Sequence, residues 1–232
     1  MLDCISVENM RCSDAETIAR GVSGLELMYR AARGVFLANS WTGAVAIVAG
    51  SGNNGGDGYA LACILHREQI PCTLFTVSSR LSEDSAHYAA QAAALNIPIL
   101  PLTPGCLTGF ATVVDCLLGT GFQGPLRQHY RHAIEQINTF SGFVVSVDIN
   151  SGMNGDTGEG ELIVRSDLTV TIGFVKQGLV TENAGRFLKR LVCVDIGINL
   201  SREEQKLCTP DETHPNALPC PHWLDTNILV IL

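Results

Sequence analysis

A glycine-rich segment at residues 50–57 combines backbone freedom with polar side chains. Its sequence is GSGNNGGD, which places the pattern G-x-G-x-x-G between a predicted strand and a predicted helix. In that setting the glycines let the backbone turn tightly and approach a phosphate, and the helix N-terminus attracts its charge. The acid that usually follows about 20 residues later to hold a ribose is absent, because the sequence there is VSSR. The segment therefore indicates a dinucleotide-like ligand but disfavours an ordinary NAD-dependent dehydrogenase.

The same segment carries side chains that a phosphate loop does not need. Asn53 and Asn54 bring amide groups, and Asp57 brings a carboxylate near the start of the predicted helix. Asp57 could be only a helix N-cap, which stabilises a helix by about 1 kcal/mol. The residue types therefore leave two interpretations of Asp57 open, a structural cap and a member of a ligand site.

Carboxylates also stand in two later apolar runs. Asp115 lies in TVVDCLL at residues 112–118, Asp148 ends FVVSVD at residues 143–148, and Ser151 follows closely. A carboxylate in an apolar strand is costly unless it is paired, hydrogen-bonded or bound to a cation. Since ligands of open α/β sheets bind at the carboxyl ends of the strands, we expect these groups to meet Asn54 and Asp57 at one mouth. Their oxygen atoms favour a hard cation over zinc.

The elements that must position these side chains alternate along the chain. Short apolar runs predict strands, and longer segments with helical spacing predict helices. The predicted strands are residues 45–49, 72–77, 112–118, 143–148, 168–172 and 191–196, and the predicted helices are 25–36, 59–68, 85–95 and 128–138. A further helix is predicted to begin at the capping-box pattern Ser13-Asp14-Ala15-Glu16.

This alternation favours βαβ units and a mainly parallel sheet. We therefore expect an α/β fold, a three-layer Rossmann-like sandwich with helices on both faces of the sheet, over residues 1–200. Residues 201–232 form a Pro-rich and polar tail that ends in an apolar run and has no assignable role.

Composition narrows the function classes. The formal net charge of -8 argues against nucleic acid as the main partner, since phosphate backbones are bound by clustered Lys and Arg. The nine cysteines form no C-x-x-C pair, which disfavours a structural zinc site. The N-terminus lacks a signal peptide pattern, and no segment approaches the ~20 continuous apolar residues of a membrane span. We expect a cytoplasmic protein that does not bind membranes.

Several ordered motifs resemble one known family. The sequence GSGNNGGDG at residues 50–58 resembles the G-x-G-N-N-G-G-D-G signature of the NAD(P)H-hydrate (NAD(P)HX) epimerases. Leu27-Met28, DCLLGTG at residues 115–121 and VDINSG at residues 147–152 are similar to later elements of that family, as are Lys176 and the segment 169–173. Asn150 stands where the family has proline, a change that loosens the φ restriction just before Ser151.

The resemblance implies an enzyme that interconverts the R and S epimers of hydrated NADH and NADPH, a repair step that feeds a separate dehydratase. It also implies a homodimer and a bound potassium ion held by Asn54, Asp115 and Ser151. The implied substrate contacts are Asn53, Asn54, Gly55, Gly56, Asp57, Gly119, Thr120, Gly121, Phe122, Gln123, Gly124, Pro125 and Asp148. No dehydratase domain is expected in the tail.

The epimerised carbon carries a hydroxyl beside the ring nitrogen, so its inversion requires a proton to move on or off oxygen. A positioned carboxylate can do this, and our hypothesis is that Asp148 is the catalytic residue. The alternative is a catalytically inactive dinucleotide-binding or scaffold module of the same fold. The presence of Asn54, Asp57, Asp115, Asp148 and Ser151 favours the enzyme.

Overall fold

A computed structural model describes residues 2–208, 217–219, 221, 224 and 229–231. Its main sheet is built from eight strands: β2 (Val45–Ala49), β3 (Cys72–Thr76), β4 (Ile99–Pro101), β5 (Thr112–Cys116), β6 (Phe143–Val147), β7 (Leu168–Ile172), β9 (Leu191–Val194) and β12 (Leu229–Ile231). The strand order is β12-β9-β7-β6-β5-β2-β3-β4, and every neighbouring pair is parallel.

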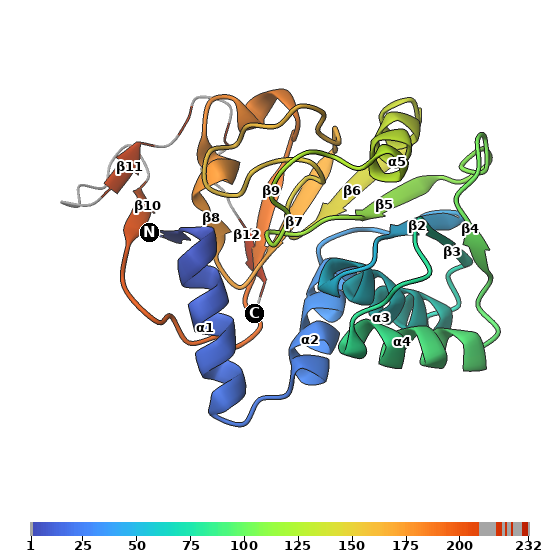
Figure 1. The fold of residues 1–232 in the computed structure, drawn as a ribbon, viewed down its shortest axis with the longest axis horizontal. Coiled ribbons are helices and arrows are strands. Elements are labelled where there is room, and N and C mark those ends of the chain that lie inside the picture. Colours follow the sequence, from blue (N-terminus) through green and yellow to red (C-terminus); the bar gives the residue numbers. More distant parts are fainter. Residues whose placement is uncertain (1, 209–216, 220, 222–223, 225–228, 232) are drawn as a thin grey trace.

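Helices cover both faces of this sheet (Figure 1). They are α1 (Val7–Ala19), α2 (Gly24–Leu37), α3 (Asn53–Arg67), α4 (Glu83–Ala94) and α5 (Gln128–Asn138). In Figure 1, α2, α3 and α4 lie on one side of the sheet and α5 lies on the other. The structure confirms the predicted three-layer α/β sandwich.

The alternation of side chains along β2 explains the two cores. Val45 and Ile47 point into the core that contains α2 and α3, while Ala46 and Val48 point into the core that contains α5. Successive side chains of a strand point to opposite faces, and all five β2 residues are buried. A strand buried on both faces must be apolar throughout, which is why the sequence shows a continuous run.

The strand order reverses direction between β2 and β5. The chain runs outward from β2 to β3 and β4 on one side, and from β5 to β6, β7 and β9 on the other. The loops after β2 and β5 therefore diverge and leave a crevice at the carboxyl edge of the sheet, which is the usual ligand position in such folds. These are the loops that carry the glycine-rich segment and residues 117–121.

Two helix starts differ from the prediction. The first helix begins after Ser6, whose side chain accepts a hydrogen bond from the Asn9 amide, so the predicted cap at Ser13 is wrong. Ser13 lies inside α1, where its hydroxyl accepts a hydrogen bond from the Ser201 amide at 2.9 Å. Helix α3 begins at Asn53 instead of Tyr59, with Gly52 at its N-cap. The N-cap interpretation of Asp57 is therefore wrong as well.

A smaller sheet of four strands joins the two ends of the described chain. It contains β1 (Leu2–Ile5), β8 (Val175–Lys176), β10 (Gln205–Cys208) and β11 (Ala217–Pro219), in the order β11-β10-β1-β8. The tail thus supplies β10, which pairs with β1, and β12, which pairs with β9. Within the described ranges, no helix is long and apolar enough to cross a membrane.

Candidate active site

The loop after β2 contains several glycines, and at most of them a neighbouring atom leaves no room for a Cβ. A Cβ on Gly50 would overlap the carbonyl oxygen of Leu117, and one on Gly55 would overlap the carbonyl oxygen of Gly50. A Cβ on Gly56 would lie 2.5 Å from the Met28 methyl group on α2. Gly52 is different, because a Cβ there would have no neighbour within 4 Å. Gly52 therefore leaves open space beside the helix N-terminus, while the other three allow close packing.

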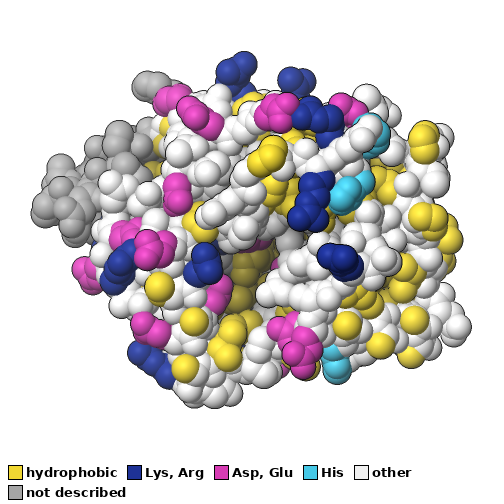
Figure 2. All heavy atoms as spheres, in the orientation of Figure 1, with side chains coloured by type: hydrophobic (Ala, Val, Ile, Leu, Met, Phe, Trp, Pro, Cys, Tyr) yellow, Lys and Arg dark blue, Asp and Glu magenta, His cyan; other side chains and the backbone are white. Residues whose placement is uncertain are grey.

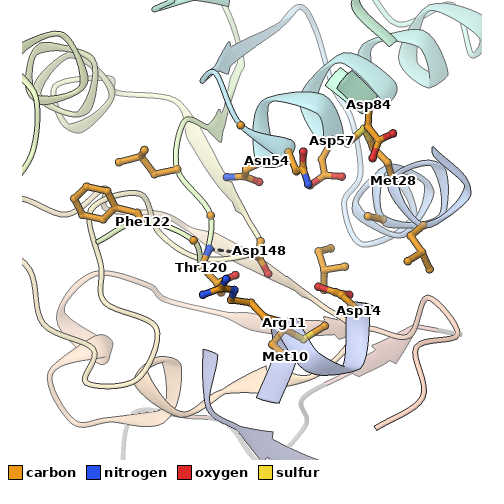
Figure 3. A pocket seen from close by; sticks show the side chains of 18 of the residues that line it. Met10, Arg11, Asp14, Met28, Asn54, Asp57, Asp84, Thr120, Phe122 and Asp148 are labelled. Carbon is orange, nitrogen blue, oxygen red and sulfur yellow. Dashed lines mark hydrogen bonds between the residues drawn. The ribbon is translucent and has the colours of Figure 1, made fainter. Parts of the chain in front are cut away.

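A cavity of about 520 Å³ lies at the switch point, against this loop. Figure 2 shows the hollow near the centre of the face in view, with apolar side chains in its depth and charged side chains along its border. In the close-up, side chains from α1, α3 and the strand ends surround the same space (Figure 3). The predicted site residues that line it are Asn53, Asn54, Asp57, Gly119, Thr120, Gly121, Phe122 and Asp148.

The remaining predicted contacts lie elsewhere. Gly55 and Gly56 are buried in helix packing, as their neighbours show. Gln123, Gly124 and Pro125 continue the exposed loop beyond Phe122 and are not among the residues that line the cavity. Their role as substrate contacts stays a prediction.

Asp148 is held in an unusual backbone conformation at the end of β6. Its φ is 68°, in the left-handed region that few side chains other than Asn and Asp adopt. Its Oδ1 pairs with Lys176 Nζ at 2.6 Å, and its Oδ2 accepts a hydrogen bond from the Thr120 amide at 3.2 Å. Strained non-glycine residues persist where the surroundings fix them, often at functional sites. Both carboxylate oxygens are thus fixed beside the cavity.

Lys176 is a buried cation beneath this carboxylate. Its side chain is 1% exposed, and its Nζ also donates to the Ile172 carbonyl at 2.7 Å and to Thr171 Oγ1 at 3.2 Å. Three acceptors therefore surround the ammonium group, which is what a charge in a dry interior needs. The sequence shows Lys176 as a member of the family pattern but gives it no role, because the pairing depends on β8 lying beside the end of β6.

Asp115 and Ser151 form a closed hydrogen-bonded unit behind the cavity. Asp115 is fully buried and accepts from Ser151 Oγ at 2.5 Å, from the Ser151 amide and Ser146 Oγ at 2.9 Å each, and from the Leu117 amide at 3.2 Å. Burial raises the pKa of Asp115, and these hydrogen bonds lower it. Ser151 Oγ also accepts from the Leu118 amide at 2.9 Å. The unit therefore fixes the start of the loop that carries Gly119 and Thr120.

Asn54 is the polar group that this unit leaves without a partner. Its side chain is 7% exposed, and neither Oδ1 nor Nδ2 has a hydrogen-bond partner among the described residues. A Cβ on Gly119 would lie 3.3 Å from Asn54 Cβ and 3.2 Å from Asp148 Oδ2. Asn54 and Asp148 thus flank the same loop residue. A buried amide without a partner calls for an additional group.

Asn150, which stands in place of proline, is firmly held. Its Nδ2 donates to the Val164 carbonyl and to Ser166 Oγ at 2.9 Å each, and its Oδ1 accepts from Thr169 Oγ1 at 2.7 Å. The backbone before Ser151 is therefore fixed by side-chain hydrogen bonds instead of by a proline ring.

Two further carboxyl groups enter the cavity from opposite sides. Asp57 comes from α3, and Asp14, which the sequence suggested only as a first-turn acid, comes from α1 (Figure 3). Burial, together with the charges of Asp148 and Asp14, raises the pKa of Asp57 well above its usual value. Burial, followed by the charge of Asp148, raises the pKa of Asp14 to about 6, although Lys176 lowers it. The spacing of residues in the sequence could not predict that α1 lies beside the cavity, because the position of this helix depends on contacts with residues distant in sequence.

The raised pKa of Asp14 predicts a pH-dependent stability effect. The folded state holds this proton more tightly than the unfolded chain, whose pKa is near 3.8, so stability falls as pH rises from about 4 to about 6 and stays lower above that. We expect Asp14→Asn to raise the free energy of unfolding at pH 8 by on the order of 2 kcal/mol. Urea unfolding of both proteins at pH 4 and pH 8 tests this. Equal differences between the two proteins at both pH values would contradict it.

The fold and the site together define a Rossmann-like α/β protein with a polar cavity at its topological switch point. Within that class, a model of the family described as YjeF-related protein N-terminus matches residues 24–178. The chain belongs to this family.

Relatives with curated names agree with this assignment. The NAD(P)H-hydrate epimerase of Limosilactobacillus fermentum is 34% identical over 82% of this chain and 95% of its own length. The NAD(P)H-hydrate epimerase of Rhodopirellula baltica is 38% identical over 68% of each chain. The bifunctional NAD(P)H-hydrate repair enzyme Nnr of Coxiella burnetii is 35% identical over 84% of this chain, which spans 42% of that protein. A crystal structure of the yeast protein YNL200c shares the fold, with a TM-score of 0.69 and 23% identity over 76% of this chain and 83% of that one.

Proposed function

We propose that this chain is an NAD(P)H-hydrate epimerase, which interconverts the R and S forms of hydrated NADH and NADPH. The observation that carries the proposal is the ion-paired carboxylate of Asp148, held at the cavity of the switch point by Lys176 and Thr120. The similarity to the Limosilactobacillus fermentum epimerase, which extends over 95% of that protein, supports the same activity.

The cavity offers suitable groups for a dinucleotide. Helix α3 has no side-chain cap, so its first backbone amides are available to a pyrophosphate beside the open position of Gly52. Asn53 is held by the Ser82 hydroxyl, which donates to its Oδ1 at 2.7 Å. The loop from Gly119 to Phe122 forms the facing wall. A nicotinamide ring between these walls would reach Asp148, which we assign as the catalytic proton-transfer residue.

The proposal includes a potassium ion bound by Asn54, Asp115 and Ser151. The unpartnered amide of Asn54 fits an oxygen ligand of a cation, and Ser151 Oγ retains a lone pair after accepting from Leu118. Asp115 supplies a negative charge, although its oxygens already accept four hydrogen bonds from the protein. When bound, the ion would supply a fixed positive charge that orders the loop and biases nearby pKa values.

Potassium binding should be visible without an activity assay. We expect potassium chloride to raise the melting temperature by on the order of 5 °C relative to tetramethylammonium chloride at equal ionic strength. Asn54→Leu removes the amide and should abolish this difference. Asn138→Leu is unsuitable as a control because Asn138 bonds two backbone groups, whereas Gln128 is exposed at the start of α5 and offers the control Gln128→Leu. An equal rise in wild type and Asn54→Leu would exclude this site.

Three wider features belong to the proposal. The enzyme acts as a homodimer, it works in the cytoplasm, and it supplies a separate dehydratase with the epimer that the dehydratase accepts. The name of the bifunctional Coxiella burnetii relative supports a link between this domain and a second repair activity. Size-exclusion chromatography with light scattering tests the dimer.

The decisive assay follows the epimer ratio of hydrated NADPH with and without the protein. Accelerated interconversion, and no change in nicotinamide oxidation state, is the expected result. Binding without acceleration would instead support an inactive scaffold module of the same fold. Hydride transfer would support an oxidoreductase and overturn the proposal.

A further inference from the structure

We propose that Asp14 is the second proton-carrying group of this cavity, acting on the face of the hydrated ring opposite to Asp148. The inference rests on the proposed epimerase function and extends it, because inversion by loss and re-addition of water needs a proton donor on one face of the ring and a proton acceptor on the other. Asp148 alone, fixed at the end of one strand, can serve one face.

The position of Asp14 is fixed by contacts on the far side of its helix. Ser13 accepts from the Ser201 amide at 2.9 Å, and Thr17 Oγ1 accepts from the Asn199 amide at 3.1 Å. The buried side of α1 is thereby tied to residues 199–201, and Asp14 is left facing the cavity (Figure 3). A carboxyl group on a rigid element is what precise proton transfer requires.

The carboxyl groups of Asp14 and Asp148 differ in their hydrogen bonds and ion pairs. Among the described residues, the side chain of Asp14 has no hydrogen bond or ion pair, although it is partly buried. Both oxygens of Asp148 are occupied, one by Lys176 and the other by the Thr120 amide. Asp14 therefore resembles a group that awaits a partner from a ligand, while Asp148 is held by its ion pair and hydrogen bond.

Charged groups from several elements surround Asp14 in the cavity. The groups that face it are Arg11 on its own helix, Asp57 on α3, Asp84 on α4, Asp148 after β6 and Lys176 on β8. Burial and Asp148 raise the pKa of Asp14 to about 6, and the pKa of Asp57 is raised well above its usual range. With its pKa at about 6, Asp14 can both give and take a proton near neutral pH. Carboxyl groups pushed to different protonation states are a signature of acid and base roles.

The acidic side chains of the cavity also suit a reaction in which water leaves the ring and a second water adds to its opposite face. Protonated Asp14 gives its proton to the ring hydroxyl, the C–O bond breaks, and the hydroxyl leaves as water. The lone pair of the ring nitrogen forms a C=N bond, so the ring becomes cationic beside the surrounding carboxylates, which stabilise it. A second water then attacks the opposite face and loses its proton to Asp148. In the other direction the two residues exchange roles.

The step makes an isotopic prediction. Because one water leaves and another enters, each inversion in H₂¹⁸O should place one ¹⁸O atom on the epimerised carbon. Mass spectrometry of both epimers, corrected for a reaction without enzyme, measures this. Inversion with retention of the original oxygen would overturn the step.

The test of Asp14 compares Asp14→Asn, Asp14→Glu and Glu8→Gln with wild type on hydrated NADPH. We expect Asp14→Asn to lower kcat by about 100-fold or more, with binding by calorimetry and folding retained. Wild-type kcat/KM should fall above about pH 6, as Asp14 loses its proton, and Asp14→Asn should lose this limb. Asp14→Glu should recover part of the rate and the limb.

Glu8→Gln is the matched control, since Glu8 is an exposed acid on the same helix and lies outside the cavity. It should behave as wild type. Wild-type turnover and an unchanged pH profile in Asp14→Asn would overturn the inference while leaving the epimerase function intact. A wild-type protein that does not accelerate epimerisation would overturn both.

Discussion

Asp148→Asn is expected to lower the kcat of epimerisation by about 1000-fold and to leave ligand binding nearly unchanged. The amide has the size of the carboxyl but cannot accept the proton that the reaction moves. Asparagine also tolerates the left-handed conformation that residue 148 adopts, with φ at 68°. The substitution therefore removes the proton acceptor and keeps the backbone conformation, while the buried Lys176 loses its charged partner, so circular dichroism must first show that the variant folds. Rates come from the epimer ratio of hydrated NADPH over time, and affinity comes from calorimetry.

The matched control for this experiment is Glu161→Gln. Glu161 is an exposed acid that pairs with Arg131 at 2.5 Å on the surface, and surface pairs contribute little. Its loss should change neither rate nor affinity. Asp148→Ala is less informative, because alanine is strained at a positive φ and a loss of activity could then reflect a shifted loop. Turnover close to wild type in Asp148→Asn would remove Asp148 from the catalytic role.

The sequence predicted the central sheet well because its strands are buried on both faces. The runs at residues 45–49 and 168–172 became β2 and β7 with the predicted bounds. Strand β1 and the tail strand β10 were missed, since they are short and belong to a sheet that pairs the two ends of the chain. Pairing between segments so distant in sequence leaves no local periodicity that could reveal it.

The predicted starts of two helices were wrong for a different physical reason. The pattern at Ser13 fits a capping box, but Ser6 already caps α1, and Ser13 uses its hydroxyl for a contact with residue 201 instead. The start of α3 was placed too late because glycine and asparagine have poor helix propensity. Close packing of Gly55 and Gly56 against neighbouring segments overrides that propensity.

The site was predictable to the extent that it lies at strand ends. Asp115 lies near the end of β5, and Asp148 and Ser151 follow the adjacent parallel strand β6, so their proximity follows from the fold class. Asp14 and Lys176 could not be placed in the same way. They reach the cavity from α1 and β8, whose positions depend on the smaller sheet.

Lys176→Met is expected to have the largest effect on stability. The ammonium group is buried among Asp148, Thr171 and Ile172, so its removal leaves the Asp148 carboxylate without its cationic partner. Breaking a buried ion pair by removing one partner costs about 3–5 kcal/mol. Methionine keeps most of the side-chain volume, which limits any cavity. Urea unfolding at pH 7.5 measures the loss, and Lys189→Met, at an exposed surface pair, is the control that should change stability little.

The charge explanation can be separated from simple packing by a double-mutant cycle. If the cost of Lys176→Met arises from the unpaired charge of Asp148, then Asp148→Asn in the same chain should recover part of it. A coupling energy of about 1–3 kcal/mol is expected for groups in direct contact. Additive effects would mean that Lys176 acts by packing alone, and Asp148 would then need another source of stabilisation for its charge.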